Sequence, residues 1–227
     1  MAFLGLFVGI DRYTSPVINW LSCATRDATA LHALFTDTFG TGGVRLTDDE
    51  ATRAGIDREF QRLLAANEDD VVVIAFSGHG SDTHELVTYD ADPSNLPGTC
   101  ISLETLTSWF KQIPARRLLC VLDCCFSGGM GAKVLHAPAI SRSIDSAASL
   151  LDQMSGDGRL IFTASKATEE AWEHRLHGHG FMTYYLLEAL QGAAEIRQGE
   201  KIAVYRLLEY VTQRVIAAAA KIGQPQH

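Results

Sequence analysis

The sequence has little positive charge and no long hydrophobic run. Its 227 residues include 19 Lys and Arg against 27 Asp and Glu, which gives a net charge of −8. Because an acidic protein repels the phosphate backbone, we expect no direct nucleic-acid partner, whereas a cationic peptide would be attracted. No apolar stretch reaches the roughly 20 residues of a membrane span. The apolar start, residues 1–10, also lacks the basic flank of a signal peptide, so we expect a cytoplasmic protein without a membrane partner.

Paired cysteine motifs are missing as well. The cysteines are odd in number, and no two are spaced as CxxC; they are Cys23, Cys100, Cys120, Cys124 and Cys125. Free thiols in a reducing cytoplasm are therefore expected rather than a disulfide framework. His174, His177 and His179 lie close together, but no Cys or His ligands stand at structural-zinc spacing. We interpret these histidines as part of a surface loop and expect no metal site.

Signatures of two other enzyme classes are absent. The glycine-rich stretch at 128–131 lacks the Lys and Ser/Thr of a phosphate-binding loop, so nucleotide binding is not expected. The GxSxG turn of α/β hydrolases is also missing. Calcium dependence stays open, because four acids that could bind the ion match no ligand loop; they are Asp82, Glu85, Asp90 and Asp92.

Apolar strands alternate with amphipathic helices along the whole chain. Hydrophobic residues make up 47% and charged residues 20%, as in a globular protein. We predict an α/β domain over 1–222, a three-layer sandwich with a central, mainly parallel sheet of about six strands flanked by helices. The strands are expected at 3–11, 44–46, 71–76, 86–89, 118–122 and 159–164, and the helices at 24–39, 49–66, 103–112, 181–190 and 204–220. A long loop is expected over 128–158, with one helix near 143–154, and residues 223–227 resemble the start of a linker or tail.

Two apolar strands end in residues that can carry chemistry. His79 follows the strand 71–76 and Cys125 follows the strand 118–122, and the two lie 46 residues apart with a helix between them. Adjacent parallel strands joined by one crossover would bring both side chains to the same edge of the sheet. An imidazole beside a thiol favours the thiolate, which is the nucleophile. The backbone N–H groups of Gly80 and Cys125 are candidates for an oxyanion hole.

These strand ends carry the motifs of a known family. Ser77-Gly78-His79-Gly80 followed by Asp123-Cys124-Cys125-Phe126-Ser127-Gly128 resembles the caspase/metacaspase cysteine peptidases. Four further stretches resemble the same family, namely residues 7–13, 23–28, 163–165 and 170–173. The resemblance implies the caspase-like fold and is closer to bacterial metacaspase-like members than to Asp-specific caspases. It departs from the metacaspase pattern at Phe126, where a His usually follows the nucleophile.

The resemblance implies a role for each matching residue. Cys125 would be the nucleophile and His79 the general acid–base, while Cys124 would point into the packing, because adjacent strand residues face opposite ways. A pocket for a basic residue would be lined by Asp27, Ser77, Asp123 and Trp172. Two carboxylates attract a guanidinium and repel an aspartate, so we expect cleavage after Arg, with Lys weaker.

Plainer roles stay open for the same residues. Asp123 fits a structural carboxylate, Asp27 fits an acid placed by the helix dipole, Ser77 fits a turn residue, and Trp172 fits a packing residue. A catalytically silent adaptor with this fold is the alternative to a peptidase. For the peptidase, the expected partners are a protein or peptide substrate and a regulatory sensor domain or activator, with no cofactor required. The loop 128–158 falls where the family is often cut for activation, and the candidate self-cleavage residues are Lys133, Arg142 and Arg159.

Overall fold

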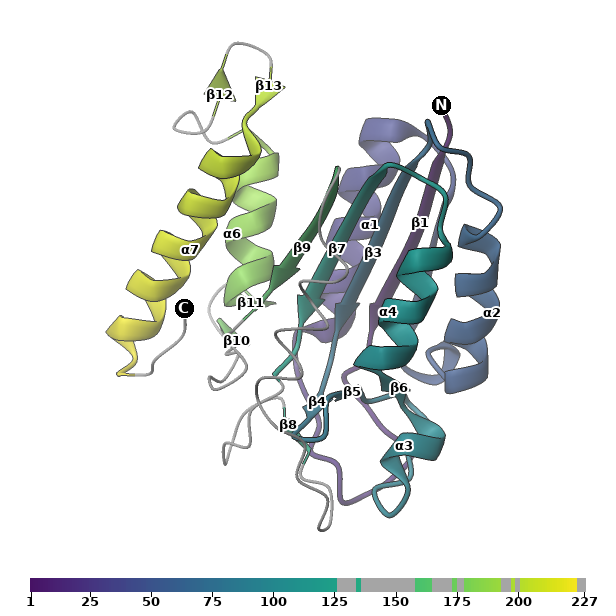
Figure 1. The fold of residues 1–227 in the computed structure, drawn as a ribbon. Helices are drawn as coiled ribbons and strands as arrows, with labels where there is room; N and C mark the ends of the chain where they lie inside the picture. Colours follow the sequence, from purple (N-terminus) through teal and green to yellow (C-terminus); the bar gives the residue numbers. More distant parts are fainter. Residues whose placement is uncertain are drawn as a thin grey trace.

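A five-stranded parallel sheet forms the centre of the protein (Figure 1). The computed structural model describes residues 1–125, 134–135, 158–164, 173–174, 178–192, 197–198 and 201–223. The strand order is β2-β1-β3-β7-β9, with β1 at Phe3–Gly9, β2 at Gly43–Thr47, β3 at Val71–Ser77, β7 at Arg117–Asp123 and β9 at Arg159–Thr163. The predicted mainly parallel sheet is confirmed, with five strands among the described residues where about six were expected.

The expected sixth strand belongs to a second, small sheet. Its strands run in the order β6-β5-β4-β8 and lie near the carboxyl ends of the central strands (Figure 1). They are β4 at Gly80–Ser81, β5 at Glu85–Leu86, β6 at Ile101–Ser102 and β8 at Val134–Leu135. Two hairpins account for the remaining strands of the described residues, β10 (Glu173–His174) with β11 (His179–Gly180), and β12 (Arg197–Gln198) with β13 (Lys201–Ile202).

Four of the predicted helices lie at or within one residue of their expected ranges, and the helix expected near 143–154 lies outside the described residues. They are α1 at Ala24–Phe39, α2 at Arg53–Leu63, the short α3 at Leu96–Thr99, α4 at Leu103–Gln112, α6 at Phe181–Leu190 and α7 at Val204–Lys221. Ser102 caps α4 as expected, because its hydroxyl accepts the Thr105 N–H at 3.1 Å. The helix predicted from 49 to 66 was wrong at both ends. A short 3-10 turn, Asp48–Glu50, comes first, and α2 starts only after Thr52, whose hydroxyl accepts the Gly55 N–H.

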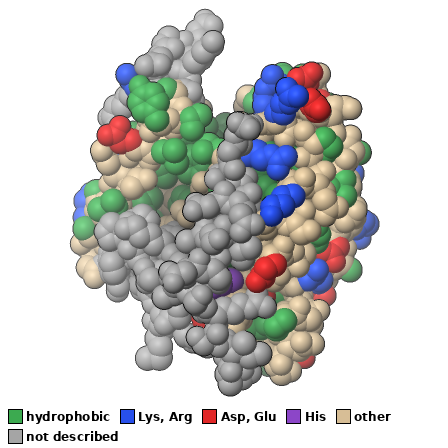
Figure 2. Space-filling model, in the orientation of Figure 1, with side chains coloured by type: hydrophobic (Ala, Val, Ile, Leu, Met, Phe, Trp, Pro, Cys, Tyr) green, Lys and Arg blue, Asp and Glu red, His purple; other side chains and the backbone are tan. Residues whose placement is uncertain are grey.

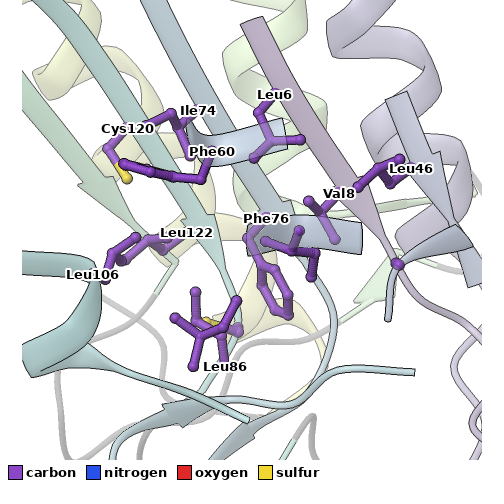
Figure 3. Packing of buried hydrophobic residues seen from close by; sticks show 14 of the residues in the cluster. Leu6, Val8, Leu46, Phe60, Ile74, Phe76, Leu86, Leu106, Cys120 and Leu122 are labelled. Carbon is purple, nitrogen blue, oxygen red and sulfur yellow. The ribbon is translucent and has the colours of Figure 1, made fainter. Parts of the chain in front are cut away.

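Each face of the sheet carries its own hydrophobic core. On one face, α2 and α4 cover alternate side chains of β1, β3 and β7, including Leu6, Ile74 and Leu122 (Figure 3). On the other face, α1 and α6 cover the remaining ones, including Phe7 and Val121. Figure 1 shows α4 in front of the sheet and α1 behind it. The chain is therefore the predicted three-layer sandwich, because the strands are apolar on both sides and need helices on both.

Hydrophobic and charged side chains are distributed unevenly over the surfaces of the two helix layers. Figure 2 shows hydrophobic side chains gathered over the α6 and α7 side of the molecule, whereas most charged side chains in view lie on the α2 and α4 side. None of the helices in the described part of the chain combines the length and apolarity needed to cross a membrane.

Candidate active site

The two motif-bearing strands are neighbours, and their ends are level with each other. β3 pairs with β7 in parallel, with Ser77 opposite Asp123. Just beyond the pairing, the Gly78 N–H donates to the Asp123 carbonyl at 3.3 Å. His79 and Cys125 each lie two residues past this matched pair, at the carboxyl edge of the sheet. The predicted placement of both residues at one edge is therefore present in the fold, and that edge is where open α/β sheets bind ligands.

The alternation of side chains along β7 separates its cysteines. Cys120 and Cys124 pack into the core under α2 and α4, whereas Cys125 packs into the core under α1 and α6. Burial raises the pKa of the Cys120 thiol strongly, and mainly burial raises the pKa of Cys100 to about 11. Such thiols stay protonated at neutral pH, so Cys100 and Cys120 serve packing. Cys125 is itself 0% exposed.

The imidazole of His79 is held by the loop between β1 and α1. Its Nε2 lies 2.7 Å from the backbone carbonyl of Asn19, which can only accept, so Nε2 carries a proton. The neutral ring then has its lone pair on Nδ1. The ring also packs against Tyr13, with the two ring centroids 5.3 Å apart.

Tyr13 fixes the backbone of His79 as well as its ring. The His79 N–H donates to the Tyr13 hydroxyl at 2.9 Å, and that hydroxyl donates to the Ile10 carbonyl at 3.3 Å. Burial is the main reason that the pKa of Tyr13 is raised well above its ordinary value. The hydroxyl therefore stays protonated and keeps both contacts across the working range of pH.

Asp27 and Ser77 meet beneath this edge. Asp27 lies in the first turn of α1 and is 0% exposed. One carboxylate oxygen accepts the Ser77 hydroxyl at 3.0 Å, and the other lies 2.7 Å from Nδ1 of His179. The Gly180 N–H lies 3.2 and 3.3 Å from the two oxygens. A buried carboxylate requires such partners, since burying a bare charge is costly.

Asp123 is held by the same segment. It is 1% exposed, and one of its oxygens accepts the Thr183 hydroxyl at 2.6 Å and the Thr183 N–H at 3.3 Å. A Cβ atom at Gly180 would stand 2.4 Å from this oxygen, so only glycine allows the approach. Residues 178–183 thus contact both acids, and the structure brings Asp27, Ser77 and Asp123 together around that segment.

Several contacts of the site were not found from the sequence. His179 was predicted in a surface loop, which was wrong, because Asp27 draws its imidazole inward. The Asn19 contact is made by a backbone carbonyl, which no side-chain pattern can reveal. Tyr13 lay in a family-like stretch, but nothing in its spacing indicated contact with His79. Thr183 lies in the largely apolar helix α6, and its polarity amid apolar neighbours was the available signal.

Some of the remaining candidate residues lie in the described part of the chain, and others do not. Trp172, Lys133 and Arg142 lie outside the described residues. Arg159 lies in β9, and its guanidinium donates to the Phe110 and Ile113 carbonyls at 2.7 Å each. Gly80 is buried in β4, where it pairs with Leu86 and Val134.

The cysteines and the candidate calcium-binding acids have other environments in the structure. All five cysteines are free and buried, which confirms the prediction of unpaired thiols. Glu85 accepts the Ser81 hydroxyl, Asp90 accepts the Arg53 N–H, and Asp92 accepts the Ser94 N–H. Within the ranges that the structure describes, no group of three or more His, Cys, Asp or Glu side chains is placed to hold a metal ion.

Comparisons with known proteins agree with this fold. A search of curated proteins found no match. Among solved structures, protein GSU0716 from Geobacter sulfurreducens is similar with a TM-score of 0.68 and 14% identity, over 94% of this chain and 89% of that one. Caspase-1 from Spodoptera frugiperda is similar with a TM-score of 0.66 and 14% identity, over 95% and 77%. The family profile described as the caspase domain matches residues 3–227. The chain therefore belongs to the caspase domain family of cysteine peptidases.

Proposed function

We propose that the protein is a cysteine endopeptidase that cleaves after basic residues, Arg before Lys, through Cys125 and His79. The observation that supports the proposal is the register of β3 with β7, which pairs Ser77 with Asp123 and brings His79 and Cys125 level at one edge. The same register pairs a hydroxyl with an acid two residues before them, and these groups are proposed to select the substrate side chain.

The dyad would act in two half-reactions. The Cys125 thiol loses its proton to Nδ1 of His79, and the thiolate attacks the carbonyl carbon before the scissile bond. The Asn19 carbonyl stabilises the imidazolium that forms, because it accepts a hydrogen bond from the Nε2–H group. His79 then protonates the leaving amine, and a thioester remains on Cys125. Water hydrolyses the thioester and frees the enzyme.

The amides of Gly80 and Cys125 are the proposed donors to the oxyanion that forms during attack. Cys125 lies two residues past the matched pair Ser77 and Asp123, and Gly80 lies three residues past it, in β4. Preorganised N–H donors stabilise the developing negative charge more than they stabilise the neutral carbonyl.

Selection of a basic residue rests on the paired acids. Asp27 and Asp123 both contact the segment 178–183, and Ser77 adds a hydroxyl. In the structure, His179 already places a basic ring on Asp27 at 2.7 Å. We propose that the substrate guanidinium replaces this imidazole, with Trp172 as a wall of the groove. An aspartate at that position would face two carboxylates and be rejected.

The test is a panel of peptides that differ only in the residue before the scissile bond: Arg, Lys, Asp and Ala. Wild type should cleave the Arg peptide fastest and the Lys peptide next. Cys125→Ala should cleave none, and Cys124→Ala should match wild type. Equal or faster cleavage of the Asp peptide would reject the basic specificity, and inactivity towards every peptide would favour the silent adaptor.

Regulation by self-cleavage is part of the same proposal. Arg159 is a poor site, because a bond inside β9 is paired with β7 and cannot enter a protease cleft. Lys133 and Arg142 are the proposed positions, and fragments ending there should vanish in Cys125→Ala. The free thiols fit action in the cytoplasm, under the control of a sensor domain or an activator.

A further inference from the structure

The loop between β1 and α1 presents one large aromatic side chain to solvent. Trp20 is 67% exposed, although neighbouring Ile18 is buried. The loop is fixed at several points. The Leu21 N–H donates to the Asp11 carbonyl at 2.9 Å, and the Thr14 N–H donates to the Tyr89 carbonyl at 3.0 Å. Trp20 is therefore an exposed ring on an ordered loop. Its exposed surface contributes no hydrophobic burial to the stability of the fold.

Trp20 directly follows the residue that holds the catalytic histidine. The Asn19 carbonyl lies 2.7 Å from Nε2 of His79, so the next residue along the chain stands beside the imidazole. The order of the strands fixes the side. The loop follows β1, His79 follows β3 and Cys125 follows β7, and these strands are neighbours in that order. Because the Asn19 carbonyl contacts His79 and the Leu21 N–H donates to Asp11, just past β1, the backbone of Trp20 lies between His79 and the end of β1, on the side of His79 away from β7.

This position lies on the side where the proposed mechanism releases the amine half of the substrate. The acyl half of a peptide stays on Cys125, above the acids, whereas the amine half leaves from His79, which protonates it. The residue after the scissile bond must therefore extend past His79 towards the loop. The guanidinium carbon of Arg12 lies over Trp20, 5.3 Å from the ring centroid. This cation–π contact orients the indole and leaves its remaining surface open.

From this arrangement we propose that Trp20 forms a binding subsite for an apolar or aromatic residue directly after the scissile bond. The inference rests on the proposed peptidase function and extends it to the leaving-group half of the substrate. A rigid indole offers a large contact area at little entropic cost, so an apolar side chain gains most from it and glycine gains least.

The experiment uses internally quenched peptides with a fixed Arg before the bond and Phe, Leu, Ser or Gly after it. The value of kcat/KM is measured for wild type, Trp20→Ala, Trp20→Phe and the control Tyr205→Ala, which removes an exposed aromatic ring on α7 (60% exposed). Trp20→Ala should lower cleavage of the Phe and Leu peptides about fivefold to tenfold and that of the Gly peptide less than about twofold. Trp20→Phe should recover most of the loss, and Tyr205→Ala should change nothing.

A second readout separates this subsite from the dyad. A peptidyl-Arg chloromethyl ketone has no residue after Arg, so its rate of Cys125 alkylation should be the same in wild type and Trp20→Ala. An equal loss for the Phe and Gly peptides, slower alkylation, or no loss at all would overturn the subsite while the peptidase function stands. Failure of wild type to cleave any peptide or to react with the ketone would overturn the proposed function and the subsite with it.

Discussion

The two faces of the central sheet share their strands but differ in chemistry. The face under α2 and α4 is almost wholly apolar where β7 crosses it, and Cys120 and Cys124 pack there. The opposite face is apolar along most of its length, but at the carboxyl edge it carries Asp27, Ser77 and Asp123. Successive strand residues point to opposite faces. The face to which a thiol or an acid points therefore decides whether it packs in the core or lies at the candidate site.

The difference shows how one strand can provide both stability and function. Along β7, each residue that faces α2 and α4 is held by dry packing, which raises the pKa of Cys120. Asp123, which faces α1 and α6 at the strand's end, instead accepts the hydroxyl of Thr183 in α6. A displacement of one residue would exchange the two sets, so the register of β7 specifies the site.

The largest expected effect comes from replacing each of the two adjacent cysteines, one from each face, by alanine. Cys125→Ala should lower kcat/KM for an Arg peptide by at least about 1,000-fold, because it removes the nucleophile. Cys124→Ala should keep activity within about threefold and lower the free energy of unfolding by about 1 kcal/mol, since it only removes packing. Peptide kinetics and urea unfolding on both variants check this, and loss of activity in Cys124→Ala would break the comparison.

The acids should give the next largest effect. Asp123→Asn keeps the shape of the side chain but removes the charge, so cleavage after Arg should fall about 30-fold to 1,000-fold. Thr183→Val is the matched control, because it removes only the hydroxyl that Asp123 accepts at 2.6 Å. The ratio of Arg to Asp peptide cleavage should drop in Asp123→Asn and hold in Thr183→Val. An unchanged ratio in both variants would make Asp123 a structural carboxylate.

Tyr13→Phe should produce a moderate loss. The variant keeps the ring against His79 but removes the hydroxyl that accepts the His79 N–H and donates to Ile10. We expect kcat to fall about tenfold with KM little changed, because the imidazole shifts while the substrate groove stays intact. A parallel rise in KM, or full activity, would show that Tyr13 does not position the histidine.

The smallest effect on activity should come from Cys120. Cys120→Ser buries a hydroxyl in an apolar core and should lower the free energy of unfolding by about 1–3 kcal/mol. Activity at a temperature where the variant is folded should match wild type. Thermal unfolding and peptide kinetics together check the prediction, and a change of kcat without a change of stability would contradict the division of the two faces.

The sequence was sufficient for the parts of the fold that depend on local periodicity. The apolar strand 71–76 and the helices 24–39, 103–112 and 181–190 have the positions that their patterns predicted. The helix 49–66 failed, because Ala51 and Thr52 interrupt a pattern that looked continuous. Thr52 caps α2, and the preceding turn is separate.

The candidate site was only partly predictable, for a different reason. His79 and Cys125 were found because each follows an apolar strand, and the paired strands bring them level. The contact between Asp27 and His179 joins residues that are far apart in the chain, so only the tertiary packing reveals it. Asn19 contributes a carbonyl that any residue would have, and sequence patterns carry no signal for it.

The most direct test of the account is to map the thiol that reacts with an Arg-based electrophilic probe. Wild type is treated at neutral pH with a peptidyl-Arg chloromethyl ketone, and the modified cysteine is identified by peptide mass spectrometry, with the Asp analogue of the probe as control. The account predicts rapid modification of Cys125 by the Arg probe, little by the Asp probe, and none at Cys120 or Cys124. Modification of Cys124, or equal reaction with both probes, would contradict it.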